Sequence, residues 1–398
     1  MLPERGPARL ALWGVGALAV ALVRNRLWAS PNLAFFTTIS DSLGRNPFEG
    51  SPLDGSYLLT NLLPVSIARA LGQTAAHEYA RLHLVVLLMG LGLVVAATHR
   101  RFGYEAARAL CVLLAAAPVV TIGFEWLGQP DAFTVPLAFG VVIAQRRWTV
   151  ATLAVLLGLT HAEQGLVIAA VAALVTVALD PNSRGGSAQD IARAGAVAAA
   201  PLAAGVLGGR LLVELYLRLN DIVVTTPRTS FFDRGAAEFA RLHGEAGGWL
   251  AYAMWGPLWM VAIVVVLRRR RLGVDLGRAW ALIALANAAP LVAMLATFDE
   301  TRVFSITAAP VLVGAAVLAT ATWEQVEFSF PVQRRTLAVS AAGLALAAVP
   351  GVFTVDGTHV ATDFPATEMG RFLVDGHHPG PDLVTWLIEP LDYDIPSN

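Results

Sequence analysis

Residues 146–179 read RRWTVATLAVLLGLTHAEQGLVIAAVAALVTVAL, two apolar runs separated by the polar turn His161-Ala162-Glu163. The runs, 148–160 and 165–179, approach the length that a helix needs to cross the hydrocarbon core of a bilayer. Loops rich in arginine stay on the cytoplasmic side of a membrane, and a pair of arginines precedes the first run. The stretch therefore predicts a transmembrane helical hairpin whose turn faces the exoplasm.

The whole chain has the composition of a membrane protein. Hydrophobic residues make up 56% of its 398 positions and charged residues 14%, against about 25% charged residues in soluble domains. Apolar runs recur from end to end, and we predict an all-α, polytopic helical bundle of about eleven transmembrane helices. The predicted spans are 8–23, 82–98, 105–123, 132–145, 148–160, 165–179, 194–216, 250–267, 279–297, 304–322 and 336–353.

The distribution of arginine orients these spans. By the positive-inside rule the N-terminus and the arginine-bearing loops are cytoplasmic. Residues 10–23 resemble a signal sequence, but Arg24 and Arg26 follow directly, which favours an uncleaved first span. The arginine-bearing loops are 100–101, 146–147, 184–193, 268–271 and 334–335. The predicted organisation is a transmembrane domain over 1–353, with exoplasmic loops at 24–81 and 217–249, and a short exoplasmic tail over 354–398.

Composition also disfavours several classes of function. The net charge of −1 argues against nucleic acid as a partner. Cys111 is the only cysteine, so no disulfide forms within one chain and no cysteine-based metal site is available. The short cytoplasmic loops carry no glycine-rich phosphate loop. We expect membrane lipids to surround most of the chain.

Two segments predict helices that lie at the membrane surface. Residues 57–72 are apolar but include Pro64 and Arg69, so we expect an interfacial or re-entrant helix there instead of a span. Residues 233–243 have an amphipathic pattern and predict a helix that lies on the membrane.

Four polar breaks fall on the predicted exoplasmic face. Acidic residues are costly near a bilayer, so several collected on one face mark a candidate functional site. The breaks are the loop around Asp41 and 48–54, the stretch 125–131, the turn 161–163, and the turn 299–302.

Two of these breaks resemble motifs of a known family. Residues 30–48 predict a short helix followed by the turn Gly44-Arg45-Asn46-Pro47-Phe48, and a second turn reads Gly128-Gln129-Pro130-Asp131. Both resemble exoplasmic turns of GT-C type, polyprenyl-phosphate-sugar-dependent membrane glycosyltransferases. The resemblance implies a multi-pass protein of the plasma membrane with a lipid-linked sugar donor and a glycan or glycolipid acceptor of the cell envelope. Asn32 stands near the position where the family carries an acidic residue.

The implied reaction suggests roles for charged residues. Transfer requires a base for the acceptor hydroxyl and a positive group for the departing phosphate. Asp41 is the only carboxylate between the first span and the Gly44 turn, so we predict that it or Asp131 is the catalytic carboxylate. Arg302 is the one basic residue in the short exoplasmic turns, and we predict that it contacts phosphate.

The other polar residues of the breaks are candidate substrate contacts with a local alternative. Gln129 and Glu125 could contact sugar hydroxyls, while Asp131 could cap the following span. Asp299, Glu300 and Arg302 could bind substrate or form a local ion pair. His161 and Glu163 could line a sugar cavity or hold a divalent metal ion, which is the candidate cofactor.

Alternatives from other classes stay open at this stage. A catalytically inactive GT-C-like protein would bind partners in cell-envelope assembly, and Asn32 favours that interpretation. A transporter would favour charges at mid-span and matched halves, whereas the acidic residues here lie at span ends. A lipid-linked glycan polymerase would carry a large arginine-bearing exoplasmic loop, which 217–249 partly matches.

Overall fold

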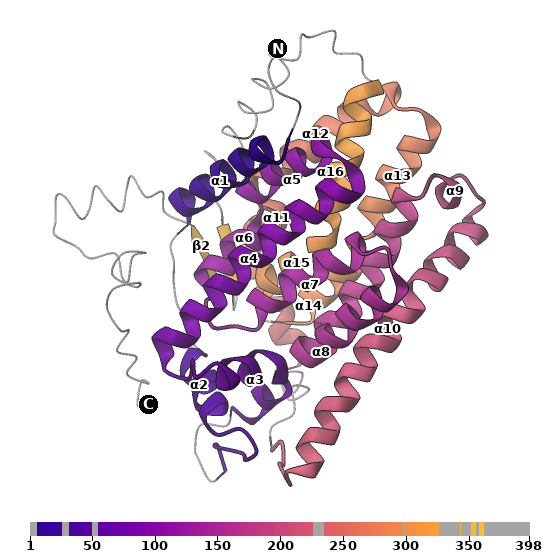
Figure 1. The fold of residues 1–398 in the computed structure, drawn as a ribbon. Helices are drawn as coiled ribbons and strands as arrows, with labels where there is room; N and C mark the ends of the chain where they lie inside the picture. Colours follow the sequence, from indigo (N-terminus) through magenta and orange to yellow (C-terminus); the bar gives the residue numbers. More distant parts are fainter. Residues whose placement is uncertain are drawn as a thin grey trace, which may run out of the picture.

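Apolar α-helices form most of the part of the chain that the computed structural model describes (Figure 1). It describes residues 6–25, 32–49, 55–225, 235–297, 299–325, 343, 352–355 and 358–361. The helices are α1 (Pro7–Arg24), α2 (Leu33–Asp41), α3 (Leu62–Ala70), α4 (Ala76–Phe102), α5 (Tyr104–Ala116), α6 (Pro118–Glu125), α7 (Asp131–Ile143), α8 (Arg147–Leu179), α9 (Pro181–Arg184), α10 (Ala188–Leu219), α11 (Ala236–Trp255), α12 (Trp259–Arg268), α13 (Val274–Leu285), α14 (Ala288–Leu295), α15 (Glu300–Thr307) and α16 (Ala309–Gln325). Short 3-10 helices occupy Ser56–Thr60 (η1), Gly256–Leu258 (η3) and Arg269–Arg271 (η4), and one hairpin pairs β1 (Val352–Val355) with β2 (Thr358–Ala361).

The predicted fold class is confirmed, since the chain is a polytopic helical membrane protein. By length and composition, five described helices can cross a membrane, or seven if two bent pairs each count as one span. The bent pairs are α5 with α6, at 55°, and α15 with α16, at 50°. The predicted number of about eleven spans is not confirmed, and most of the last predicted span, 336–353, lies outside the described residues. The β1–β2 hairpin is an addition to the predicted all-α bundle.

The structure breaks α8 at the turn that the opening stretch predicted. His161 has non-helical torsion angles (φ −163°, ψ 89°) between two helical arms. A Cβ built on Gly165 would lie 3.5 Å from the Cβ of Leu157, whereas eight residues of straight helix rise about 12 Å. The chain therefore folds back sharply at His161, although length and composition alone count α8 as one candidate span.

Helix α10 packs against both arms of α8 at very short range. A Cβ on Gly158 would lie 2.1 Å from the carbonyl oxygen of Val206, and one on Gly209 would lie 2.2 Å from that of Val155. The side chain of Val206 also reaches Gly165 in the second arm, at 3.0 Å from a built Cβ. Glycine is required at positions 158 and 209 because a side chain there would meet backbone atoms of the neighbouring helix.

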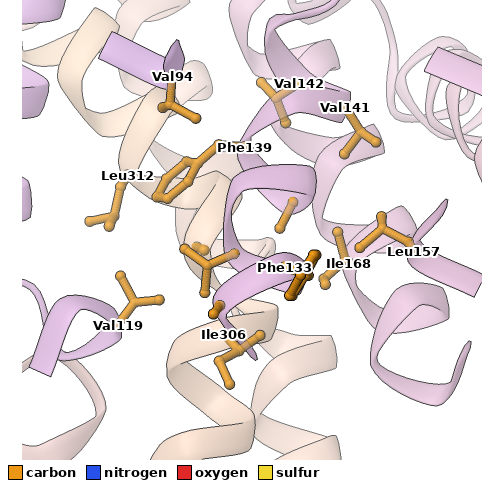
Figure 2. Close-up of a cluster of buried hydrophobic side chains, with 14 of the residues drawn as sticks. Val94, Val119, Phe133, Phe139, Val141, Val142, Leu157, Ile168, Ile306 and Leu312 are labelled. Atoms are coloured by element: carbon orange, nitrogen blue, oxygen red, sulfur yellow. The ribbon is translucent and has the colours of Figure 1, made fainter. Parts of the chain in front are cut away.

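The core gathers apolar side chains from the middle of the bundle. Figure 2 shows Phe133 of α7 and Ile306 of α15 lying near one another, with Phe139 of α7 and Leu312 of α16 further along the same cluster. Phe139 and Ile306 are fully buried. This packing fixes the start of α7 relative to α15, the two helices that carry the charged residues discussed below.

The predicted surface helices are short or broken. The segment 57–72 forms η1 and α3, and the nine residues of α3 are too few to cross a bilayer. Residues 236–243 of the second predicted segment begin α11, which breaks at Gly247 (φ 53°). Three charged residues of the loop 217–249, Arg228, Asp233 and Arg234, lie outside the described residues.

The β1–β2 hairpin packs onto the bundle instead of starting a separate tail. It contacts α11 and α15, and the backbone N–H of Thr354 donates to Oγ1 of Thr301 at 2.9 Å. Strand β1 begins at Val352, so the last two residues of the predicted span 336–353 are extended. Residues 362–398 of the predicted tail lie outside the described residues.

Candidate functional site

A buried ion pair between Arg302 and Asp131 forms the centre of the candidate site. Nε of Arg302 donates to Oδ2 of Asp131 at 2.5 Å, and Nη2 donates to Oδ1 at 3.2 Å. The exposed fraction of the side chain is 9% for Arg302 and 1% for Asp131. The two parallel hydrogen bonds are the forked geometry in which a guanidinium binds a carboxylate most firmly.

Three further side chains complete the cluster around Arg302. Nη1 donates to Oδ2 of Asp299 at 2.7 Å, and Nη2 reaches Oε1 of Gln129 at 3.5 Å. The guanidinium carbon lies 5.6 Å from the ring centre of Trp126, close enough for a cation–π contact. Four of the five N–H groups of Arg302 thus have recorded acceptors. Asp299 is one-third exposed and forms the open side of the cluster.

The turn 126–131 delivers Gln129 and Asp131 to this position. Gly128 has φ +94°, and a Cβ there would lie 2.5 Å from Leu33, so only glycine fits. Helix α7 then begins at Asp131, with Pro130 as its N-cap residue. Asp131 is the first residue of the helix and not its N-cap, and its carboxylate accepts both hydrogen bonds from Arg302.

Helix α15 positions Arg302 and Asp299 on the other side of the cluster. It spans only eight residues before the 50° bend into α16, and Asp299 immediately precedes it. Glu300 is fully buried, and Thr301 shares a hydroxyl contact of 2.9 Å with Thr354 of the hairpin. The first turn of α15 is thus held by the bundle and by β1, which fixes the origin of the Arg302 side chain.

An apolar cavity of about 450 Å³ is lined mainly by residues of α11, α12, α13 and α16. Its lining includes Trp255, Leu258 and Trp280, with Asn287 and Arg269 as its polar members. Trp255 packs edge-on against Phe304, with ring centres 5.7 Å apart. Trp255 therefore connects the lining of the cavity to α15, the helix that also carries Arg302.

Of the remaining predicted site residues, Asp41, His161 and Glu163 make other contacts, whereas Glu125 adjoins Trp126 of the cluster. Asp41 ends α2 and pairs with Arg69 of α3 at 2.9 Å, an exposed contact that does not include Arg302. His161 Nδ1 lies 3.3 Å from Glu163 Oε2 at the break of α8. Glu125 ends α6, half-buried, directly before Trp126. Within the described part of the chain, no group of three or more His, Cys, Asp and Glu side chains is placed to hold a metal ion.

The structure also brings in residues that the sequence did not single out. Thr354 and Trp255 contact the helix that carries Arg302, and His83 lies within electrostatic range of Asp131. His83 is fully buried in α4 and its Nδ1 bonds to the carbonyl of Tyr79 at 2.8 Å. The only signal for His83 was a histidine within an apolar run, which does not indicate what lies across from it.

Comparison with known proteins finds likeness only at the level of fold. No protein-family model matches the chain, and no curated protein matches it in sequence. Among solved structures it is similar to ArnT from Cupriavidus metallidurans in the apo state, with 16% identity over 85% of this chain and a TM-score of 0.43. It is also similar to an oligosaccharyltransferase from Archaeoglobus fulgidus in complex with zinc and sulfate, with 14% identity over 85% of this chain and a TM-score of 0.40. The chain covers 63% and 52% of the lengths of these two structures, less than two thirds of either.

Proposed function

We propose that this protein is a GT-C type glycosyltransferase of the plasma membrane. It moves a sugar, with inversion, from a polyprenyl-phosphate donor to a glycan or glycolipid acceptor on the exoplasmic face. The observation that carries the proposal is the Arg302 cluster, whose helix contacts the lining of the apolar cavity through the packing of Phe304 against Trp255. A lipid-linked sugar has the same two parts, a charged phosphate and a long apolar chain.

The cluster supplies a charged group for the leaving phosphate. One N–H of Arg302 Nη1 has no recorded acceptor among the described residues, and it can donate to a phosphate oxygen. Asp131 holds the guanidinium with both carboxylate oxygens, so its plane is fixed before substrate arrives. A donor that is already in place stabilises charge as it develops in the transition state without reorganising.

The exposure of the carboxylates divides their roles. Asp299 is one-third exposed, so an acceptor hydroxyl can reach it, and we assign it the role of base. Asp131 is shielded and bidentate, so it acts as a positioning residue through Arg302. Asp41 stays a second candidate for the base. Its ion pair with Arg69 is exposed on both sides, so its removal disturbs the fold little.

Transfer of labelled sugar from polyprenyl-phosphate donors in membranes tests the proposal. The variants are Asp299→Asn, Asp41→Asn and Asp131→Asn, with Asp275→Asn as the matched control. Asp275 is an exposed carboxylate in the first turn of α13, away from the cluster. Size-exclusion profiles in detergent report whether each variant folds.

The outcomes separate the roles of the carboxylates. Loss of a general base lowers the rate by about 10²–10⁴-fold, and we expect that loss for Asp299→Asn with an unchanged profile. The same loss in Asp41→Asn alone would move the base to α2. Wild-type membranes that transfer no sugar from any polyprenyl-phosphate donor would overturn the function.

A binding role without catalysis is the second candidate. It is favoured by Asn32, the residue before α2, which stands near the position where the resembled family carries an acidic residue. A protein of that kind would bind the lipid-linked donor with full affinity in the Asp299→Asn and Asp41→Asn variants while transferring no sugar in any form. Binding measured beside transfer therefore distinguishes the two functions.

A further inference from the structure

A separate cavity of about 530 Å³ lies between α1, α4 and α5. It follows α1 from Pro7 to Ala21, a distance of about 20 Å at the rise of an α-helix. The hydrocarbon of one leaflet is about 15 Å thick, half of the bilayer core. The cavity is therefore long enough to accept an extended acyl chain.

The walls of this cavity are built from small residues that leave it open. A Cβ on Gly14 or Gly92 would meet no other atom within 4 Å, and Gly92 and Ala96 are exposed. By contrast, a Cβ on Gly90, two residues away on α4, would lie 2.3 Å from Pro136. One face of α4 is thus tightly packed against α7, while the face that carries Gly92 opens toward the bilayer.

One end of the cavity is positively charged. His99 and Arg100 line it at the C-terminal end of α4, on the face that the arginines predict to be cytoplasmic. Arg101 joins α4 to the end of α7, because its Nη1 donates hydrogen bonds to the carbonyls of Val142 and Ala144. Arg100 is exposed, and the described residues record no ion pair for it. The buried Nδ1 of His99 likewise has no hydrogen-bond partner there.

We propose that this cavity binds an anionic glycerophospholipid of the cytoplasmic leaflet. An acyl chain lies along α1 between Gly14 and Gly92, and the headgroup phosphate accepts hydrogen bonds from Arg100 and His99. Charge complementarity selects an anionic lipid, because no acidic side chain in the described lining would complement the amine of a zwitterionic headgroup. This site does not depend on the sugar-transfer function, since it lies on other helices.

The test measures which lipids stay bound to the full-length protein. The protein is reconstituted in nanodiscs of equal parts phosphatidylglycerol and phosphatidylcholine, released into detergent, and weighed by native mass spectrometry. The variants are Arg100→Gln and Gly92→Leu, and the matched control is Arg147→Gln, an exposed arginine of the same face outside the cavity. Size-exclusion profiles confirm that all four proteins fold.

We expect the wild type to retain phosphatidylglycerol in preference to phosphatidylcholine. Arg100→Gln reduces that preference about fivefold, the effect of one arginine near an anionic headgroup, and Arg147→Gln leaves it unchanged. Gly92→Leu fills the cavity and lowers retention of both lipids. Equal retention of the two lipids by the wild type overturns the proposal. An equal loss in Arg147→Gln, or full retention by Gly92→Leu, also overturns it, since binding would then reflect general surface charge.

Discussion

Arg302 and Asp131 are separated by 171 residues in sequence, yet two hydrogen bonds join their side chains in the interior of the bundle. The pair ties the start of α7 to the first turn of α15, the helix whose Phe304 packs against Trp255 in the lining of the apolar cavity. Most of the predictions below follow from this contact or from the close helix packing that surrounds it.

Breaking the pair from one side destabilises the protein more than removing both partners. Arg302→Met leaves the Asp131 carboxylate buried without its cation, at a cost of about 3–5 kcal/mol in the free energy of unfolding. The double variant Asp131→Leu with Arg302→Met removes both charges, so we expect a smaller loss than the sum of the single losses. Thermal unfolding of the single and double variants in detergent completes a double-mutant cycle. Additive losses of stability would show that the two charges are not coupled.

The glycine crossing of α8 and α10 tolerates no side chain. Gly158→Ala drives a methyl group to 2.1 Å from the Val206 carbonyl oxygen and to 2.9 Å from Cα of Gly209. The helices must separate, and we expect a loss of about 1–3 kcal/mol. Gly208→Ala is the matched control, since its Cβ would meet no atom within 4 Å and alanine favours the helix by about 1 kcal/mol. We expect a lower melting temperature for Gly158→Ala alone. Equal shifts in melting temperature for the two variants would contradict the close approach of α8 and α10 at Gly158.

The hydroxyl of Thr301 anchors the β1–β2 hairpin to the bundle. Thr301→Val leaves the buried N–H of Thr354 without its acceptor, at a cost of about 1–3 kcal/mol. We expect faster proteolysis within 352–361 and an unchanged melting temperature for the bundle. The control is Thr152→Val, whose hydroxyl bonds only to the Trp148 carbonyl of its own helix. Unchanged protection of the hairpin in Thr301→Val would show that other contacts hold it.

The fold-back at His161 predicts the membrane sidedness of three positions. In a Cys111→Ala background, single cysteines replace Arg147, Glu163 and Asn182, all of them exposed. An impermeant thiol reagent applied to intact cells should label only the cysteine at position 163, because the two arms of α8 return the chain to its starting face. Labelling in permeabilised cells gives the maximum labelling of each cysteine. Opposite sidedness for positions 147 and 182 would mean that α8 crosses the membrane once.

The sequence by itself determined the fold class and the candidate residues. Apolar runs of spanning length leave a chain few options, because unpaired backbone groups cannot face hydrocarbon. The polar turn at 161–163 predicted a reversal where the structure breaks α8. Gln129, Asp131, Asp299 and Arg302 all stood out as polar residues at span ends, and the structure gathers the four of them into one cluster.

Only the tertiary structure decided which of these residues meet. In a membrane protein the lipid-facing and protein-facing sides of a helix are both apolar, so periodicity does not indicate which helices are neighbours. The sequence predicted Asp131 as a catalytic carboxylate or a cap, and Arg302 as a phosphate contact or part of a local pair. Their contact with each other depends on how α7 packs against α15. Asp41 stood out as the only carboxylate between the first span and the Gly44 turn, yet the packing of α2 on α3 gives it Arg69 as a partner at the surface. Which charged side chains form pairs is decided only when the apolar surfaces of the helices that carry them pack together.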